Sequence, residues 1–117
     1  MTENKQTVRR YMEAFARSDH AQVLACLTDD IEWVIPGYVR LKGKRAFDGE
    51  IENPAFEPNP EITVTRLIEE GNVVVAEGSV CTRKRDGELL NLVFCDVFIM
   101  SAGKIRHLTS YLVPLNT

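Results

Sequence analysis

The chain has 117 residues, of which 44% are hydrophobic and 26% charged, and its formal net charge is −3. This length and composition predict one globular domain over residues 1–117, which buries roughly two-thirds of the surface that the unfolded chain exposes. Acidic and basic residues are interspersed, which argues against nucleic acid or an anionic membrane as a partner. No apolar run reaches membrane-spanning length, and the first residues lack the apolar core of a signal peptide.

The cysteines and histidines limit the sulfur and metal chemistry that the chain can support. Cys26, Cys81 and Cys95 are unclustered and lack CxxC spacing, which favours buried thiols and predicts a cytoplasmic location. His20 and His107 cannot complete a metal site by local spacing, and no glycine-rich phosphate loop is present, so we expect neither metal nor cofactor. We expect His20 to be solvated, and His107 to face solvent or a second subunit.

The first predicted element is an amphipathic helix over residues 3–17. Val8, Tyr11, Met12 and Phe15 recur at the spacing of one helix face, and charged residues occupy the other positions. Tyr11 therefore lies on the buried face, where it is either a core residue or a hydroxyl that reaches a ligand.

Two short helices and a strand are predicted to follow. Asp19 and Gln22 form the pattern of a helix cap, so a helix begins there. Residues 31–35 are predicted to form a strand that Pro36 ends. Residues 43–51 are expected to form a third short helix, and the prolines beyond it exclude a helix or a central strand.

Four strands joined by tight turns are predicted in the second half, over residues 62–69, 73–84, 89–100 and 104–115. The third of these is apolar on both alternating faces, so we expect both faces to be covered. Asp96 is its only acidic or basic side chain. A buried carboxylate is costly unless it is paired, hydrogen-bonded or neutralised by a raised pKa. Asp96 is therefore either a structural carboxylate or the main functional candidate.

The order of elements predicts the α+β class, with helices on one face of an antiparallel sheet. The sequence resembles the nuclear-transport-factor-2-like superfamily, in particular its SnoaL-like and ketosteroid-isomerase-like group. The resemblance rests on Arg10-Tyr11, the stretch Leu27–Trp33, Asp96-Val97-Phe98 and Gly103-Lys104-Ile105. It implies a cone-shaped fold in which a curved antiparallel sheet wraps around the N-terminal helices and encloses one pocket.

Ketosteroid isomerase provides a mechanistic comparison. In that enzyme a helix tyrosine and a neutral aspartic acid donate hydrogen bonds to a developing enolate, while a second aspartate moves the proton. The resemblance places the two donors at Tyr11 and Asp96, and the base at Ile35. Isoleucine cannot accept a proton, so this chain keeps both donors and lacks the base. The match to limonene-epoxide hydrolase is poor, because Ser110 stands at the position of one of its carboxylates.

Further residues are candidates for substrate binding. The side chains expected to line the pocket, or else to belong to the core, are Phe15, Trp33, Ile35, Phe47, Phe98, Leu108 and Ser110. One strand face carries Glu77 and Arg83, and two placements stay open for it. Either this face is a polar outer stripe, or it points into the pocket, where Glu77 would replace the missing base and Arg83 would hold an anionic group.

Two classes of function follow. The first is an isomerase or cyclase that acts on an apolar carbonyl compound, with Tyr11 and Asp96 as oxyanion donors. The second is a non-catalytic module that binds a small apolar ligand or mediates dimerisation. A second carboxylate near Asp96 would favour the first class. The outer face of residues 89–100 stays apolar under either hypothesis, which predicts a homodimer through the sheet.

Overall fold

The computed structural model describes residues 2–52 and 54–115. Helices and strands follow the predicted order closely, with one strand added. In chain order they are α1 (Glu3–Ala16), α2 (His20–Ala25), β1 (Leu27–Ile35), β2 (Val39–Lys42), α3 (Lys44–Ile51), β3 (Glu61–Glu70), β4 (Val73–Arg83), β5 (Leu89–Ser101) and β6 (Lys104–Pro114).

The six strands form a single sheet in the order β2-β1-β6-β5-β4-β3. The α+β class is confirmed, and the sheet is mostly antiparallel as expected; one pair differs, since β1 runs parallel to β6. A parallel pair needs a long crossover, and here α3 and the β3–β5 hairpins separate the two strands along the chain. β2 was not predicted either; it has four residues and pairs with β1.

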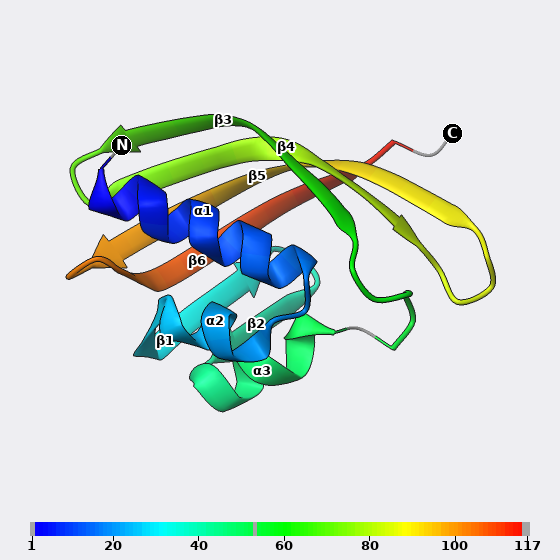
Figure 1. The fold of residues 1–117 in the computed structure, drawn as a ribbon, viewed down its shortest axis with the longest axis horizontal. Coiled ribbons are helices and arrows are strands. Elements are labelled where there is room, and N and C mark those ends of the chain that lie inside the picture. Colours follow the sequence, from blue (N-terminus) through cyan, green and yellow to red (C-terminus); the bar gives the residue numbers. More distant parts are fainter. Residues whose placement is uncertain (1, 53, 116–117) are drawn as a thin grey trace.

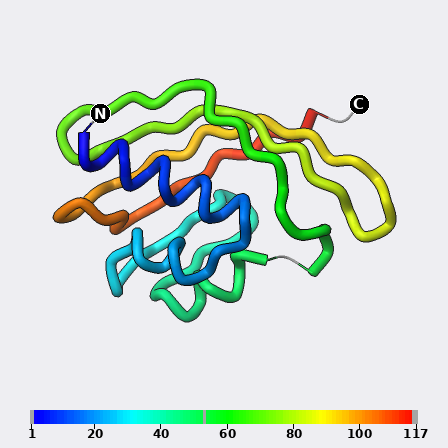
Figure 2. Tube along the Cα trace, viewed as in Figure 1, coloured from blue at the N-terminus to red at the C-terminus, as the bar shows by residue number. Residues whose placement is uncertain are grey.

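The helices lie on one side of the sheet, which bends over α1 (Figures 1 and 2). Helix α1 contacts β3, β4 and β6, while α2 and α3 pack near β1. The predicted cap at Asp19 is confirmed, because its carboxylate accepts a hydrogen bond of 3.1 Å from the backbone N–H of Gln22. No helix within residues 2–52 and 54–115 is long and apolar enough to cross a membrane.

The core fills the space between α1 and the sheet. The Tyr11 ring lies 5.7 Å from the Phe98 ring in an edge-to-face arrangement, which joins the helix stripe to the middle of β5. Trp33 of β1 stacks on Phe47 of α3, with 4.7 Å between ring centroids. These aromatic contacts hold the helices against the concave side of the sheet.

Gly78 of β4 lies at a place with no room for a side chain. A Cβ atom at this position would lie 2.0 Å from the backbone oxygen of Thr63 and 2.9 Å from the Phe94 ring. The β3–β4 register shifts beside it, between Val64 and Arg66. Neither a backbone carbonyl nor a buried ring can move aside easily, so only glycine fits this position.

We predict that Gly78→Ala lowers the free energy of unfolding by roughly 1–3 kcal/mol, the usual cost of overpacking, as measured by urea denaturation. Gly49→Ala is the matched control, because a Cβ atom there would meet nothing within 4 Å. Alanine is the better helix former by about 1 kcal/mol, so the α3 variant should be more stable than the wild type. Equal stability of the Gly78→Ala protein and the wild type would contradict the close packing.

Candidate functional site

A cavity of about 930 Å³ opens between helix α1 and the sheet. Its lining side chains come from α1, β1, β4, β5 and β6 and from the proline-containing segment 54–60. The size falls within the range of small-molecule pockets.

Asp96 borders this cavity from the middle of β5. Strand alternation gives it the same face as Phe94 and Phe98, and the residue is only 7% exposed. Its Oδ1 atom is buried and makes no hydrogen bond within the described part of the chain. Burial raises the pKa of Asp96 to about 7, while a hydrogen bond from Ser110 acts in the opposite direction. The carboxyl is therefore close to half protonated at neutral pH.

Tyr11 borders the same cavity from α1 and is 3% exposed. Burial, and then the charges of Asp96 and Cys26, raise the pKa of Tyr11 well above its usual value. The hydroxyl therefore keeps its proton at any physiological pH. Tyr11 supplies a permanent donor, whereas Asp96 supplies a donor that titrates.

Ser110 and Trp33 complete the polar part of the cavity wall. Ser110 is 4% exposed and lies directly opposite Asp96 in the β5–β6 register. The indole Nε1 of Trp33 donates a hydrogen bond of 3.0 Å to the Ser110 Oγ. The Trp33 ring is also edge-to-face with Phe15, with 6.0 Å between centroids. A hydroxyl, an indole and a carboxyl thus meet at one apolar wall.

The structure divides the predicted substrate-binding residues into two groups. Phe15, Trp33, Ile35 and Ser110 border the cavity together with Tyr11 and Asp96. The core holds the other three, whose exposed fractions are 1%, 0% and 0%: Phe47, Phe98 and Leu108. These three do not border the cavity, because they are packed between the helices and the sheet: Phe47 on α3, Phe98 on β5 and Leu108 on β6.

Neither Glu77 nor Arg83 borders the cavity, which agrees with the outer-stripe alternative. Glu77 is half exposed and lies 3.5 Å from Arg66, and the Arg83 Nη1 donates a hydrogen bond of 2.7 Å to the backbone oxygen of Gly87. The inward positions of β4 are taken by its buried small residues, Ala76 and Gly78. Glu77 therefore cannot replace the base, and Arg83 does not reach Asp96.

Sequence reasoning missed several charged residues that also border the cavity: Glu50, Glu52, Glu57 and Arg85. They belong to the end of α3, to the segment after it and to the β4–β5 turn. Segments of this kind carry no periodic pattern, so nothing in the sequence distinguished these residues from ordinary surface charges.

The profile of the SnoaL-like domain family matches residues 8–108. The chain belongs to the SnoaL-like family. Comparison with curated protein sequences finds no significant match.

Solved structures show the same nuclear-transport-factor-2-like fold. A protein of unknown function from Burkholderia pseudomallei has 25% identity and a TM-score of 0.87, with 97% of this chain and 92% of that one covered. An LEH-like epoxide hydrolase from Mycobacterium tuberculosis has 21% identity and a TM-score of 0.83, with 95% and 83% covered. A Kribbella flavida protein, provisionally named a ketosteroid isomerase, has 20% identity and a TM-score of 0.78, with 98% and 81% covered.

Relatives of this SnoaL-like chain thus include isomerase-like, cyclase-like and epoxide-hydrolase-like proteins as well as proteins of unknown function. Two matched structures hold small molecules: a Catenulispora acidiphila protein with trimethylamine, and TerC with polyporic acid. The comparisons therefore establish the family and the fold, and the choice among activities depends on the site itself.

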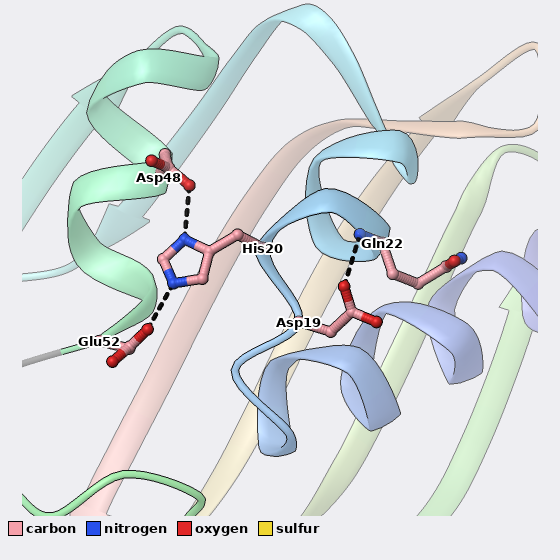
Figure 3. A network of polar contacts seen from close by, with 5 residues as sticks. All are labelled: Asp19, His20, Gln22, Asp48 and Glu52. Carbon is pink, nitrogen blue, oxygen red and sulfur yellow. Dashed lines mark hydrogen bonds and ion pairs between the residues drawn. The ribbon is translucent and has the colours of Figure 1, made fainter.

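His20 corrects another expectation. It is not simply solvated, because its Nδ1 lies 2.6 Å from Asp48 and its Nε2 lies 2.5 Å from Glu52 (Figure 3). The two carboxylates accept but cannot donate, so only the protonated imidazole satisfies both contacts. The hydrogen bonds that His20 donates to Glu52 and Asp48 raise the pKa of His20 accordingly. His107 lies at the outer face as expected, 3.1 Å from Glu32.

We predict that His20 stabilises this SnoaL-like protein in a pH-dependent way. A folded-state pKa above the unfolded value makes the contribution complete below pH 6.5, and it is lost as pH rises through the folded-state pKa. The unfolding free energy of the wild type minus that of His20→Gln should therefore decrease as pH rises. The double variant Asp48→Asn, Glu52→Gln should lose the same pH dependence. A pH-independent difference would rule out the charged contact.

Proposed function

We propose that this chain is a small-molecule enzyme of the isomerase or cyclase type, which acts on an apolar carbonyl compound. The observation that carries the proposal is Asp96, a buried carboxyl with an unpaired oxygen at the wall of a large apolar cavity. Tyr11 borders the same cavity and keeps its proton. Two donors on one cavity wall are suited to the oxygen of a carbonyl group on which negative charge develops.

In the proposed reaction the substrate oxygen accepts hydrogen bonds from the Tyr11 hydroxyl and from protonated Asp96. Solvent water takes a proton from the adjacent carbon, the C–H electron pair moves toward the carbonyl and places negative charge on its oxygen, and the two donors stabilise the enolate. Ile35 borders the cavity at the position of the base and cannot take the proton. The substrate must therefore have an unusually acidic C–H bond, as between two carbonyl groups, or must arrive as its enol.

We predict that Ile35→Asp raises exchange of the α protons of a simple cyclic ketone such as 2-tetralone by about 100-fold, the usual contribution of a positioned base. Hydrogen–deuterium exchange followed by NMR measures this rate. Tyr11→Phe and Asp96→Leu, each made in the Ile35→Asp background, should remove most of the gain because each deletes one oxyanion donor. Bound ketone that exchanges no faster with Ile35→Asp than with the wild type would refute the proposed donor geometry.

A second candidate function is ligand binding without catalysis, and Ile35 is the observation that favours it. An apolar cavity with a few polar groups binds small molecules whether or not it transforms them. Two relatives were crystallised with small ligands. A 1,3-diketone distinguishes the two functions: the proposed enzyme accelerates exchange of its α protons, whereas a binding module holds it without acceleration.

We further propose that the protein forms a homodimer through the outer face of the sheet. This face carries apolar side chains that are 39% to 49% exposed: Ile68, Leu89 and Val93. Val97 lies among them, paired with Val75 of β4 and Thr109 of β6. A twofold contact with a second copy would cover this face.

We predict that Val97→Lys converts the dimer into a monomer at micromolar concentration, because a lysine ammonium cannot be buried without a partner. Light scattering measures the mass of both proteins. Tyr38→Lys is the matched control, since Tyr38 is 71% exposed and lies at the cavity rather than on the outer face. A monomeric wild type would disprove the dimer, and circular dichroism checks that both variants keep their helices.

A further inference from the structure

The Ser110 hydroxyl lies between an indole and a carboxyl that come from the two strands beside its own. β6 carries Ser110, with β1 on one side and β5 on the other. The indole Nε1 of Trp33 on β1 donates to the Ser110 Oγ at 3.0 Å, and Asp96 on β5 is the cross-strand partner of Ser110. All three residues border the cavity and are at least nine-tenths buried.

The chemistry of the three groups fixes the direction of hydrogen bonding. An indole N–H can only donate, an ionised carboxylate can only accept, and a hydroxyl does both. Trp33 occupies one acceptor position of the Ser110 oxygen, so the single proton of Ser110 is free for Asp96. We propose that Ser110, oriented by Trp33, is a positioning residue that directs its proton to Asp96 and holds this carboxyl at the cavity wall. This inference rests on the proposed role of Asp96 toward the ligand.

The hydrogen bond from Ser110 favours the ionised form of Asp96, because a protonated carboxyl is stabilised less by accepting it. Burial favours the neutral form, and the pKa of about 7 reflects both effects. Other neighbours add little: Tyr11 faces Asp96 from α1 as a neutral hydroxyl, and the β4 partner is Ala76. The thiol of Cys95 points to the opposite face of β5. The remaining charged groups of the cavity are Glu50, Glu52, Glu57 and Arg85.

A purely structural role for Ser110 makes a different prediction. In that case Ser110 would only satisfy the buried indole N–H, and its removal would lower stability without changing the titration of Asp96. The protonation of Asp96 therefore separates the two roles, and it can be followed by NMR in full-length, ligand-free protein labelled with ¹³C at the aspartate carboxyl carbons.

We expect the wild-type Asp96 signal to titrate near pH 7. Ser110→Ala should raise the midpoint by roughly one pH unit, the size expected when a charged acceptor loses one hydrogen bond. Ser110→Thr keeps the hydroxyl and should stay within a few tenths of the wild type. Ser79→Ala, a matched deletion from the outer face of β4, should leave the midpoint unchanged. An unchanged midpoint in folded Ser110→Ala would overturn the proposal.

Trp33→Phe tests the second half of the inference. It removes the indole N–H and keeps an aromatic ring, so the Ser110 hydroxyl loses the donor that fixes its direction. The Asp96 midpoint should rise in this variant by less than in Ser110→Ala, and Trp33→Phe should have no further effect in a Ser110→Ala background. An equal shift in both backgrounds would show that Trp33 acts on Asp96 without Ser110, and would overturn the proposed relay.

These titrations need no substrate, so they can fail while the proposed enzyme activity stands. Conversely, an Ile35→Asp protein that gains no exchange activity would remove the catalytic role of Asp96 and leave its hydrogen bond from Ser110 intact. The two proposals are therefore tested by separate measurements on the same chain.

Discussion

The cost of burying the Asp96 carboxyl is the constraint on which the arrangement of the site depends. An ionised carboxylate in an apolar cavity needs a cation or several donors. Within the described residues Arg83 is turned toward Gly87 and Arg66 pairs with Glu77 on the outer face, so neither reaches Asp96. Partial protonation of Asp96 lowers the cost of its burial instead. The carboxyl consequently titrates near neutral pH, the range in which a group can both give and take a proton.

The fold produces this site through its one parallel strand pair. β1 lies beside β6 only because a long crossover returns the chain in the same direction, and the register places Trp33 opposite Leu108. The indole therefore starts two residues from Ser110 on the neighbouring strand and reaches it with its N–H. Helix α1 then covers the concave side and adds Tyr11. Two elements from the first third of the chain, α1 and β1, thus meet two from its last third, β5 and β6, at one cavity.

Much of the fold was predictable because the spacing of apolar residues within a single helix or strand can be read directly from the sequence. The stripe of α1, the cap at Asp19 and the strand ends follow from residue type and spacing, and the apolar neighbours of Asp96 indicated its burial. The parallel pairing of β1 was not predictable, since pairing between distant strands leaves no local pattern. The mixed composition of both faces of β4 hid the outward direction of Glu77. For Phe47 and Phe98 the sequence left pocket and core both open, because it does not show which inward aromatic side chains are packed between the helices and the sheet.

Ile35 links the missing base to the titration of Asp96. In ketosteroid isomerase the neutral acid has a pKa above roughly 9 because its site is apolar, and a separate aspartate moves the proton. A carboxylate at position 35 would raise the pKa of Asp96 further if it lay close by, since like charges disfavour ionisation. In this chain burial raises the pKa of Asp96 to about 7, and a hydrogen bond from Ser110 acts in the opposite direction. In the proposed function Ile35 thus has two effects: it supplies no base, and it leaves the pKa of Asp96 lower than a nearby carboxylate at position 35 would.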